Sequence, residues 1–514
     1  MKRRLSACIL LTMLVFAGCT QKDQFAEWEE DWAASESTVS QDVSEAESEE
    51  VIPEELMDSA QLVKYNAAEQ GLIRPYELKP TTNDAPNVDW AYSAFKVIEA
   101  NIIKQGKANK DTIDLSEGNF IYYGINNEAA HLANPEEDMF FLSSEYGVQS
   151  TDIYYKGISA MMFTYIGADG RGIVSESDVP FEEGNREEIT SSLEGMAMAD
   201  SQGDIHRTDS DWIITGIRNI DVADSELIKQ EILDKGAVQI AYEFSENNYN
   251  DGAYYTKYFG GRNTRTAVVV GWDDAYPRTN FREGMQPEKD GAWLLYDCIG
   301  SMLGSDGYIW LSYENKCTTN IISYDVAERS KYGSVLSYDK LGYNNIIKAN
   351  GEEYTVIANV YETEEDETVS AIGIYTLAPE QQVEVEVYTG VYDENPDSGT
   401  LAATMSVTSD ALCYQVFELP QEVSVKAGEK FSVVLKYLND DADEMYGAAP
   451  TEGPEGSFSM GIKINIFYAS AEGQSFAKKD GTWYDLSREE SADQFDNKIS
   501  VYNNACMKVL MKKK

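Results

Sequence analysis

Basic residues are scarce in this chain. Its 514 residues include 41 lysines and arginines against 89 aspartates and glutamates, which gives a formal net charge of −48. So acidic a surface repels nucleic acid and anionic lipid headgroups, and we expect neither as a direct partner. Hydrophobic residues, by contrast, make up 43% of the chain and aromatic residues 11%, which is typical of a globular protein long enough for two or three domains.

Cysteine and histidine are scarce as well. The body of the chain holds too few cysteines for a disulfide scaffold, although one bridge per domain remains possible. These cysteines are Cys298, Cys317, Cys413 and Cys506. His131 and His206 are the only two histidines, so few side chains could exchange protons near neutral pH.

The N-terminus has the features of an export signal. Basic residues precede the mostly apolar stretch 5–16, which is too short for a typical membrane-spanning helix. The following Ala17-Gly18-Cys19 resembles a bacterial lipobox, although Phe16 stands where leucine is usual. We therefore predict a lipoprotein signal peptide over residues 1–19, with Cys19 lipidated on the outer face of the cytoplasmic membrane. The alternative is a plain secretory signal in which Cys19 is incidental.

Composition divides the rest of the chain into three parts. Residues 20–52 are rich in serine and glutamate and cannot bury enough apolar surface to fold, which predicts an extended tether. Residues 54–330 begin with helical periodicity and continue with apolar β runs, which favours an α+β domain with a helical lobe and a β lobe. Residues 338–510 contain alternating strands such as 383–388 and turn clusters such as 395–399, which is typical of an antiparallel β-sandwich.

The helical signal in the second part follows Pro86, a residue that often precedes a helix. Residues with one shared face recur there at spacings of three and four: Trp90, Ala94, Val97, Ile98 and Asn101. The β runs of the same part are residues 237–242, 267–272 and 292–296.

The start of this helix resembles a known active site. Residues 83–95 read Asn-Asp-Ala-Pro-Asn-Val-Asp-Trp-Ala-Tyr-Ser-Ala-Phe. They resemble the motif Q-G-x-C-G-x-C-W-A-F of the papain-like cysteine peptidases, in which the nucleophilic cysteine precedes the tryptophan. Further segments match the clostridial-type branch of this family in the same order: Glu99 and Asn101, 114–117, 172–181, 266–274, 290–294 and 304–313. The resemblance covers about residues 72–325 and implies the two-lobe papain-like fold.

Aligned on these segments, every chemical position departs from the family. Asn83 stands at the oxyanion-hole glutamine, Asp89 at the nucleophile, Arg265 at the general-base histidine and Asp297 at the asparagine that orients the base. Ile299 and Leu303 stand where the family has the two tryptophans that follow. A carboxylate cannot perform thiolate acyl transfer, and a guanidinium cannot exchange protons near neutral pH. The resemblance therefore implies a peptidase fold with replaced catalytic residues.

No other side chain offers an evident replacement. Neither histidine lies in a matching motif, and Cys298, one residue beyond Asp297 in a predicted strand, should point away from the cleft. Asp89 and Asp297 could form a carboxylate pair for acid/base chemistry. We expect Arg265 between them to keep both ionised, which removes the shared proton that such a pair needs.

The replacements preserve the order of charges in the family's resting site. Asp89 would be an anion at a helix N-terminus, where the helix dipole stabilises it by roughly 0.3–1 kcal/mol. Arg265 would replace the imidazolium, with Asp297 on its far side, and its several donors predict hydrogen bonds to both carboxylates. The alternative is a set of unrelated charges left after functional decay.

The C-terminal part resembles the lectin-like domain that follows such clostridial-type papain homologues. The segments that carry this resemblance are 371–376, 383–388, 425–434, 473–476 and 480–483. Trp483 and Tyr484 could stack on sugar rings, although aromatic residues in sandwiches are more often core residues. The acidic loop 439–444 lacks EF-hand spacing, and no metal or cofactor is predicted.

These features predict an exported surface lipoprotein with a catalytically inactive papain-like domain and a lectin-like domain. Its expected ligands are peptide or cell-wall carbohydrate material. One alternative is an active peptidase with altered catalytic residues, and another is a purely structural surface protein.

Overall fold

The computed structural model describes somewhat less than the whole chain, and the statements below concern the described residues. These are residue 59 and ranges 62–75, 89–120, 139–144, 167–180, 210–258, 264–297, 306–339, 342–343, 345–392, 394–409, 411–439, 445–453, 455–458, 462–467, 470–492, 494–495 and 503–513. The signal segment and the tether lie outside them.

Strands dominate the described residues. The helices are α2 (Asp89–Lys104), α7 (Ser225–Lys235) and α8 (Glu489–Ala492), with short 3-10 turns at Glu246–Asn248, Arg278–Asn280 and Arg329–Lys331. The strands of the N-terminal region are β1 (Lys64–Asn66), β2 (Met139–Ser144), β3 (Trp212–Ile220), β4 (Val238–Glu243), β5 (Tyr249–Asn250), β6 (Ala253–Tyr254), β7 (Thr264–Asp273), β8 (Ala292–Tyr296), β9 (Tyr308–Ser312) and β10 (Thr318–Glu328). Those of the C-terminal region are β11 (Val335–Leu336), β12 (Asn345–Ile347), β13 (Tyr354–Glu362), β14 (Glu367–Thr376), β15 (Gln381–Thr389), β16 (Thr400–Ser409), β17 (Leu412–Val425), β18 (Lys430–Leu438), β19 (Ala449–Glu452), β20 (Glu455–Phe458), β21 (Ile462–Phe467), β22 (Ser475–Lys479), β23 (Thr482–Asp485), β24 (Asn504–Ala505) and β25 (Met507–Lys513).

Helix α2 is the predicted helix, and it is buried more completely than its sequence pattern indicates. The periodic residues predict one apolar face, yet 14 of its 16 residues are buried. Lys96 and Glu99 tolerate this burial because they pair with each other at 2.6 Å, and Glu99 also accepts a hydrogen bond from the Leu115 backbone at 3.1 Å. A helix buried on nearly all sides is a core element, and its first residue is therefore held firmly in place.

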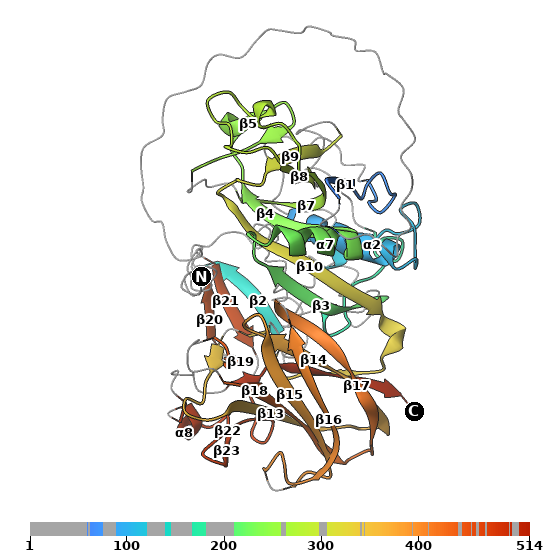
Figure 1. Cartoon of the computed structure of the whole chain (residues 1–514). Helices are drawn as coiled ribbons and strands as arrows, with labels where there is room; N and C mark the ends of the chain where they lie inside the picture. The colour runs from blue at the N-terminus through green and yellow to red at the C-terminus, as the bar shows by residue number, and fades with distance from the viewer. Residues whose placement is uncertain are drawn as a thin grey trace.

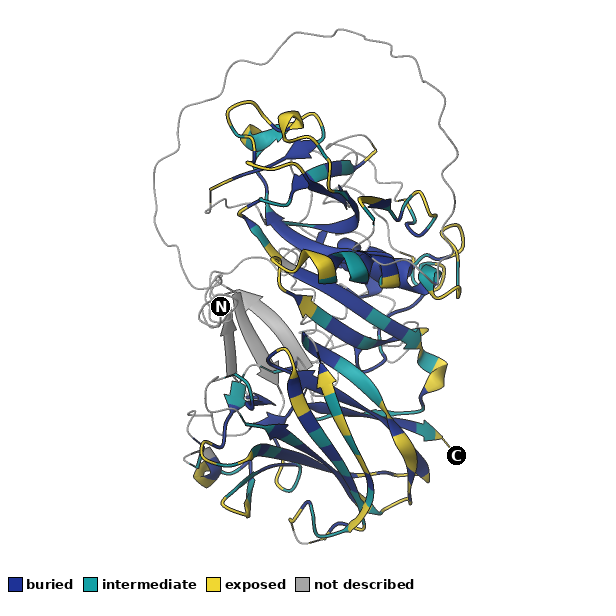
Figure 2. Ribbon diagram, viewed as in Figure 1, coloured by how far each residue is buried: buried dark blue, intermediate teal, exposed yellow. Residues whose placement is uncertain are grey.

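An antiparallel sheet packs against α2. In this sheet β4 pairs with β7 and β10, and β7 pairs with β8. Helix α7 lies beside α2 on the same side (Figure 1). Figure 2 shows α2 and these central strands as mostly buried. Two of the family-like segments also meet, since Leu115 forms a β-bridge with Ser175. The N-terminal region thus has a helix against a sheet, with the start of α2 directed at β7.

The C-terminal region contains the predicted sandwich of alternating strands. One sheet has the order β16-β15-β18-β13-β22-β23. The strands β11, β25, β14 and β17 form the facing layer. On β15, the valines at 383, 385 and 387 are buried against the opposite layer while Glu384 and Glu386 alternate with them. This alternation confirms the strand predicted over residues 383–388.

The two regions share one sheet, which the sequence did not indicate. Strand β17 of the C-terminal region pairs antiparallel with β3 of the N-terminal region, with Tyr414 opposite Ile217. The sheet consequently runs without interruption from β11 through β17 and β3 to β7 and β9 (Figure 1). A second pairing, between β2 and β21, joins the regions at another point. Each region thereby covers a strand edge that the other would otherwise expose.

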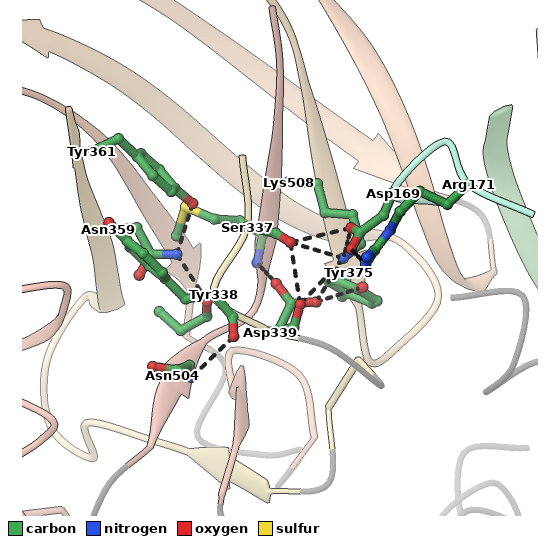
Figure 3. Close-up of polar contacts among 12 residues, drawn as sticks. Asp169, Arg171, Ser337, Tyr338, Asp339, Asn359, Tyr361, Tyr375, Asn504 and Lys508 are labelled. Carbon is green, nitrogen blue, oxygen red and sulfur yellow. Dashed lines mark hydrogen bonds and ion pairs between the residues drawn. The ribbon is translucent and has the colours of Figure 1, made fainter. Parts of the chain in front are cut away.

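A buried lysine lies at this junction. Lys508 of β25 is fully buried, and its Nζ lies 2.8 Å from Asp169 Oδ1 and 3.3 Å from Asp339 Oδ2. Burial alone would lower the pKa of this ammonium, but the two carboxylates raise it above its ordinary value. Asp339 also accepts hydrogen bonds from Tyr375 and from the Met507 backbone (Figure 3). Asp169 comes from the N-terminal region, so this cluster connects the two regions electrostatically.

Two further features concern the predictions above. Cys317, Cys413 and Cys506 are buried, and no disulfide joins them within the described ranges, while Cys298 lies outside these ranges. No helix in the described part of the chain has the length and apolar character needed to span a membrane.

Candidate functional site at the start of helix α2

Three segments place the predicted site residues near one another. Asp89 is the first residue of α2, Arg265 is the second residue of β7, and Asp297 directly follows β8. The pairing of β7 with β8 continues to Val268 opposite Tyr296, which brings Asp297 alongside the start of β7. The resemblance correctly predicted that these three residues converge.

The first turn of α2 is fixed by buried polar side chains. Gln239 of β4 donates from Nε2 to the Trp90 carbonyl at 3.0 Å and to Ser93 Oγ at 2.7 Å. The side-chain oxygen of Gln239, Oε1, in turn accepts a hydrogen bond from the Tyr324 hydroxyl at 3.0 Å. Ser93 Oγ donates to the Asp89 carbonyl at 2.6 Å. These bonds set the position of Asp89, and Gln239 is a residue that the sequence motif did not identify.

Asp89 is a buried carboxylate with few polar partners. It is 4% exposed, and its Oδ2 accepts a hydrogen bond from the Thr266 backbone N–H at 2.6 Å. Burial raises the pKa of Asp89 to about 6, against the opposing effect of Thr266 and with a further increase from the charge of Asp297. Arg265 lowers this pKa only weakly, as the last of the contributing causes. Arg265 therefore contributes little to the ionisation of Asp89, although a pKa of about 6 still leaves this carboxylate mostly ionised at neutral pH.

Arg265 forms its ion pair with Asp297. Its Nη1 lies 3.1 Å from Asp297 Oδ2, with the Arg265 side chain 30% exposed and that of Asp297 2% exposed. The guanidinium also lies over the ring of Phe244, 4.4 Å from the ring centroid. Within the described residues no ion pair joins Arg265 to Asp89 at 4.0 Å or less. The predicted contact of Arg265 with both carboxylates is thus only half correct, because Asp297 and Phe244 hold the guanidinium while the Thr266 N–H takes the Asp89 oxygen.

Tyr242 completes the surroundings of the site. It lies directly opposite Arg265 in the pairing of β4 with β7, so the two side chains share a face of the sheet. Tyr242 is fully buried, and its hydroxyl has no hydrogen-bond partner among the described residues. Burial, and after it the charge of Asp297, raises the pKa of this hydroxyl well above its ordinary value. The charge of Arg265 lowers this pKa, and the charge of Asp89 raises it. A fully buried hydroxyl without a partner is energetically costly.

Several predicted positions lie outside the described residues. These are Asn83, Cys298, Ile299, Leu303, His131, His206 and Cys19. The residues that sequence reasoning missed are Gln239, Tyr242, Phe244 and Thr266. The first three lie in or just after the β run predicted over 237–242, and the pairing of β4 with β7 would have been needed to assign them to the site.

The two aromatic residues proposed for sugar stacking face opposite ways. Tyr484 packs into the sandwich core, with its ring centroid 6.2 Å from that of Phe495. Trp483 lies on the outer side of the six-stranded sheet, where Lys478 Nζ is 5.0 Å from its ring centroid. Trp483 is partly buried and packs against an apolar cluster that includes Val360 and Phe476. No group of three metal-binding side chains is found within the described residues.

The chemistry available at the start of α2 is limited. Asp89 can exchange a proton near neutral pH because its pKa is about 6. Asp297, the second carboxylate, bonds Arg265, and no hydrogen bond joins it to Asp89 among the described residues. A shared-proton carboxylate pair is thus not formed here. The described residues of the site include no nucleophile of the thiolate type.

Comparison with known proteins agrees with the resemblance. Residues 87–328 match the papain family cysteine protease domain, and residues 335–509 match the lectin-like domain. The chain is similar to the structure of a clostridial cysteine protease, a Cwp84 variant after propeptide cleavage, with 19% identity, a TM-score of 0.65, and coverage of 88% of this chain and 100% of that one. No curated protein matched the chain.

A second similar structure contains the cysteine protease and lectin-like domains of Cwp84, a surface layer associated protein of Clostridium difficile. Its identity is 18% and its TM-score 0.65, and the match covers 88% of this chain and 89% of that one. At this identity the likeness establishes the fold. The chain therefore carries a domain of the papain family of cysteine proteases followed by a lectin-like domain.

Proposed function

We propose that this chain is an exported surface lipoprotein whose papain-like domain does not cleave peptides and instead binds peptide or cell-wall material. The observation that carries the proposal is the side chain before Trp90. There the family has a nucleophilic cysteine, and this chain has the buried carboxylate of Asp89. Cysteine-peptidase chemistry requires a thiolate nucleophile and a base that exchanges its proton.

The neighbouring residues support the loss of this chemistry. Arg265 stands at the position of the general base, and it is engaged with Asp297 and with the ring of Phe244. A guanidinium remains charged at all ordinary pH values and cannot accept the nucleophile's proton. The proton-exchange capacity of Asp89 does not replace a nucleophile, because no second group is placed to share its proton.

An activity assay on the purified ectodomain tests the proposal. We expect no turnover of peptide substrates and no labelling by thiol-directed epoxide inhibitors. Asp89→Cys alone should not restore turnover, because Arg265 still provides no base. Turnover that persists in a preparation free of contaminating protease, checked against a mock purification, contradicts the proposal and favours an active peptidase with altered residues.

We propose a carbohydrate contact on the lectin-like domain as the second binding surface. Trp483 supports this, since its ring lies on the outer side of the six-stranded sheet beside Lys478, whose Nζ is 2.6 Å from Asp397 Oδ2. An aromatic ring flanked by charged hydrogen-bonding groups suits a sugar ring. Trp483→Ala should abolish binding to cell-wall glycan fragments. Tyr388→Ala, on the same face, is the comparison variant and should leave this binding in place. Absence of any glycan or peptide binding in a thermal-shift screen would favour a purely structural surface protein.

We further propose that Cys19 carries the lipid anchor. The basic start, the short apolar stretch and Ala17-Gly18-Cys19 support it. Mass spectrometry of the mature N-terminus decides the matter. Cleavage at another position with an unmodified Cys19 contradicts it.

A further inference from the structure

Strand β16 forms an open edge of the lectin-like domain. It is the first strand of the six-stranded sheet, and among the described residues it pairs with β15 alone. With ten residues it is the longest strand at the end of any sheet in the described part of the chain, where the others have two to six. Figure 2 shows exposed residues along it, and exposed and more buried residues alternate from Ala403 to Thr408. An edge strand presents a row of unpaired backbone N–H and C=O groups to its surroundings.

The edge of β16 lacks the usual protection against pairing with another chain. Its residues, Thr-Leu-Ala-Ala-Thr-Met-Ser-Val-Thr-Ser, include no charged residue and no proline. Its one irregularity is the bulge at Ala402, so the stretch 403–409 is regular. Strand β17 of the facing layer is different, because beyond its pairing with β3 it contains Pro420 and the exposed Glu418 and Glu422. Charges and prolines on an edge prevent pairing, and β16 is left open to it.

Exposed apolar side chains lie at the same place. Leu401, near the start of β16, is 49% exposed, and Tyr392, in the turn that leads into this strand, is 60% exposed. They are two of the five large apolar residues that are exposed among the described residues. Large apolar side chains exposed near one another are typical of an interaction surface.

Charge decides which partner suits this edge. A net charge of −48 makes two copies of the chain repel each other over most of their surfaces. Strand β16 adds no charge, and the two carboxylates on the outward face of the neighbouring β15 are engaged within the chain: Glu386 with Lys436, and Glu384 with the Tyr354 hydroxyl at 3.2 Å. A second copy offers the same uncharged strand, so the two edges can meet without placing like charges opposite each other.

We propose that two copies of this protein form a dimer by antiparallel pairing of their β16 strands, which joins two six-stranded sheets into one. This inference is independent of whether the papain-like domain cleaves peptides. A two-fold axis at the centre of the regular stretch 403–409 places Ser406 opposite the partner's Ser406 and Thr404 opposite the partner's Thr408. Residues directly opposite in an antiparallel pair lie on the same face, so these hydroxyls line one face of the joint and Met405 and Val407 line the other.

Analytical ultracentrifugation of the ectodomain that follows Cys19 tests the proposal. We expect a reversible monomer–dimer equilibrium whose dissociation constant falls several-fold when NaCl is raised from about 50 mM to about 500 mM, because salt screens the repulsion between two acidic chains. An interface held by ion pairs would respond in the opposite direction. Ser406→Lys places two ammonium groups opposite each other at the two-fold axis and should weaken the dimer at least tenfold. Ser424→Lys is the control, since it makes the same change at an exposed strand residue of the facing layer, and it should leave the dimer unchanged.

A cysteine variant tests the position of the two-fold axis. Oxidation of Ser406→Cys with copper phenanthroline should join two copies through a disulfide at residue 406, because directly opposite Cβ atoms of an antiparallel pair lie about 4.5–5.5 Å apart. Ser424→Cys and the wild-type chain should yield no such cross-linked dimer on a non-reducing gel.

Several results would overturn the inference. One is an ectodomain that stays monomeric at every protein and salt concentration, and another is a dimer that weakens as salt rises. Dimerisation of Ser406→Lys as strong as that of Ser424→Lys would place the contact on another surface, and cross-linking of Ser406→Cys no greater than that of Ser424→Cys would do the same. None of these outcomes concerns peptide cleavage, so failure here leaves the proposed function as it stands.

Discussion

The molecule contains two buried clusters of charged side chains, and they differ in how the charges are paired. At the domain junction the Lys508 ammonium contacts both Asp169 and Asp339, at 2.8 Å and 3.3 Å. At the start of α2 the Arg265 guanidinium pairs with Asp297 at 3.1 Å, and Asp89 accepts a hydrogen bond from the Thr266 backbone N–H with no cation within 4.0 Å among the described residues. At the junction Arg171 also pairs with Asp169, at 2.7 Å, so two cations face two carboxylates and every charge is paired. At the start of α2 a single cation faces two carboxylates.

The pKa directions express the same difference. At the junction, burial opposes the charge of Lys508, yet its carboxylate neighbours raise its pKa above the ordinary value, so the ion is stabilised by its partners. In the cleft, burial raises the pKa of Asp89 to about 6, so the ion is destabilised by its surroundings. A fully paired cluster serves the fold. An incompletely paired one lowers stability.

The largest expected effect follows from breaking the junction cluster. We expect Lys508→Met to lower the free energy of unfolding by about 3–5 kcal/mol, because it leaves the Asp339 carboxylate buried without its cation and leaves Asp169 with Arg171 alone. Urea unfolding at pH 7 measures the change.

A lysine on the same strand serves as the control. Lys512 pairs with Glu422 at the surface, with side chains 37% and 48% exposed, and Lys512→Met should change stability by about 0–1 kcal/mol. If Lys508→Met lowers the unfolding free energy no more than Lys512→Met does, the junction cluster does not stabilise the fold. The contrast between the two clusters then fails.

The next effect has the opposite sign and depends on pH. Asp89→Asn should stabilise the protein by up to about 3 kcal/mol at pH 8, because the shift of roughly two pKa units is worth about 1.4 kcal/mol per unit. The folded-state pKa of about 6 lies above the ordinary value of 3.8. The native state therefore binds this proton more tightly than the unfolded state, and stability decreases as pH rises from 3.8 to about 6.

The pH profile of that variant isolates the contribution of Asp89. The difference in unfolding free energy between Asp89→Asn and wild type should be near zero at pH 4 and reach its full value above pH 7. Asp178→Asn, which changes an exposed carboxylate, should show no such profile. A gain that is equal at pH 4 and pH 8 would mean that Asp89 is not held as an under-paired anion.

The order of short motifs was enough to predict the fold of the N-terminal domain and the convergence of three site residues. Trp90 marks the start of the helix, and Arg265 is the second residue of the strand that begins at Thr264. The partners of these residues were not predictable. The choice of Arg265 between Asp89 and Asp297 depends on the Thr266 N–H and the Phe244 ring, which are positioned by strand register rather than by any motif.

Long-range features were missed for a related reason. The alternation along residues 383–388 predicts a strand with one buried face, but it does not say which strands continue the sheet. The pairing of Tyr414 with Ile217 joins two domains across almost two hundred residues, and no local pattern marks either strand as the edge partner of the other. From the sequence, Lys508 would be taken for a surface residue of a basic C-terminal segment. The structure shows Asp169 beside it.

The smallest expected effect separates the charge of Arg265 from its shape. Arg265→Lys keeps a cation near Asp297 but loses the planar group over the Phe244 ring, and we expect a cost of about 0.5–1 kcal/mol. Arg265→Ala also removes the charge from beside Asp297, whose side chain is 2% exposed, and should cost about 1–3 kcal/mol. Urea unfolding at pH 8 compares the two variants with wild type. Equal costs would mean that the shape of the guanidinium, not its charge, holds the Arg265 pair, so that this pair could no longer be compared with the charge pairing of Lys508.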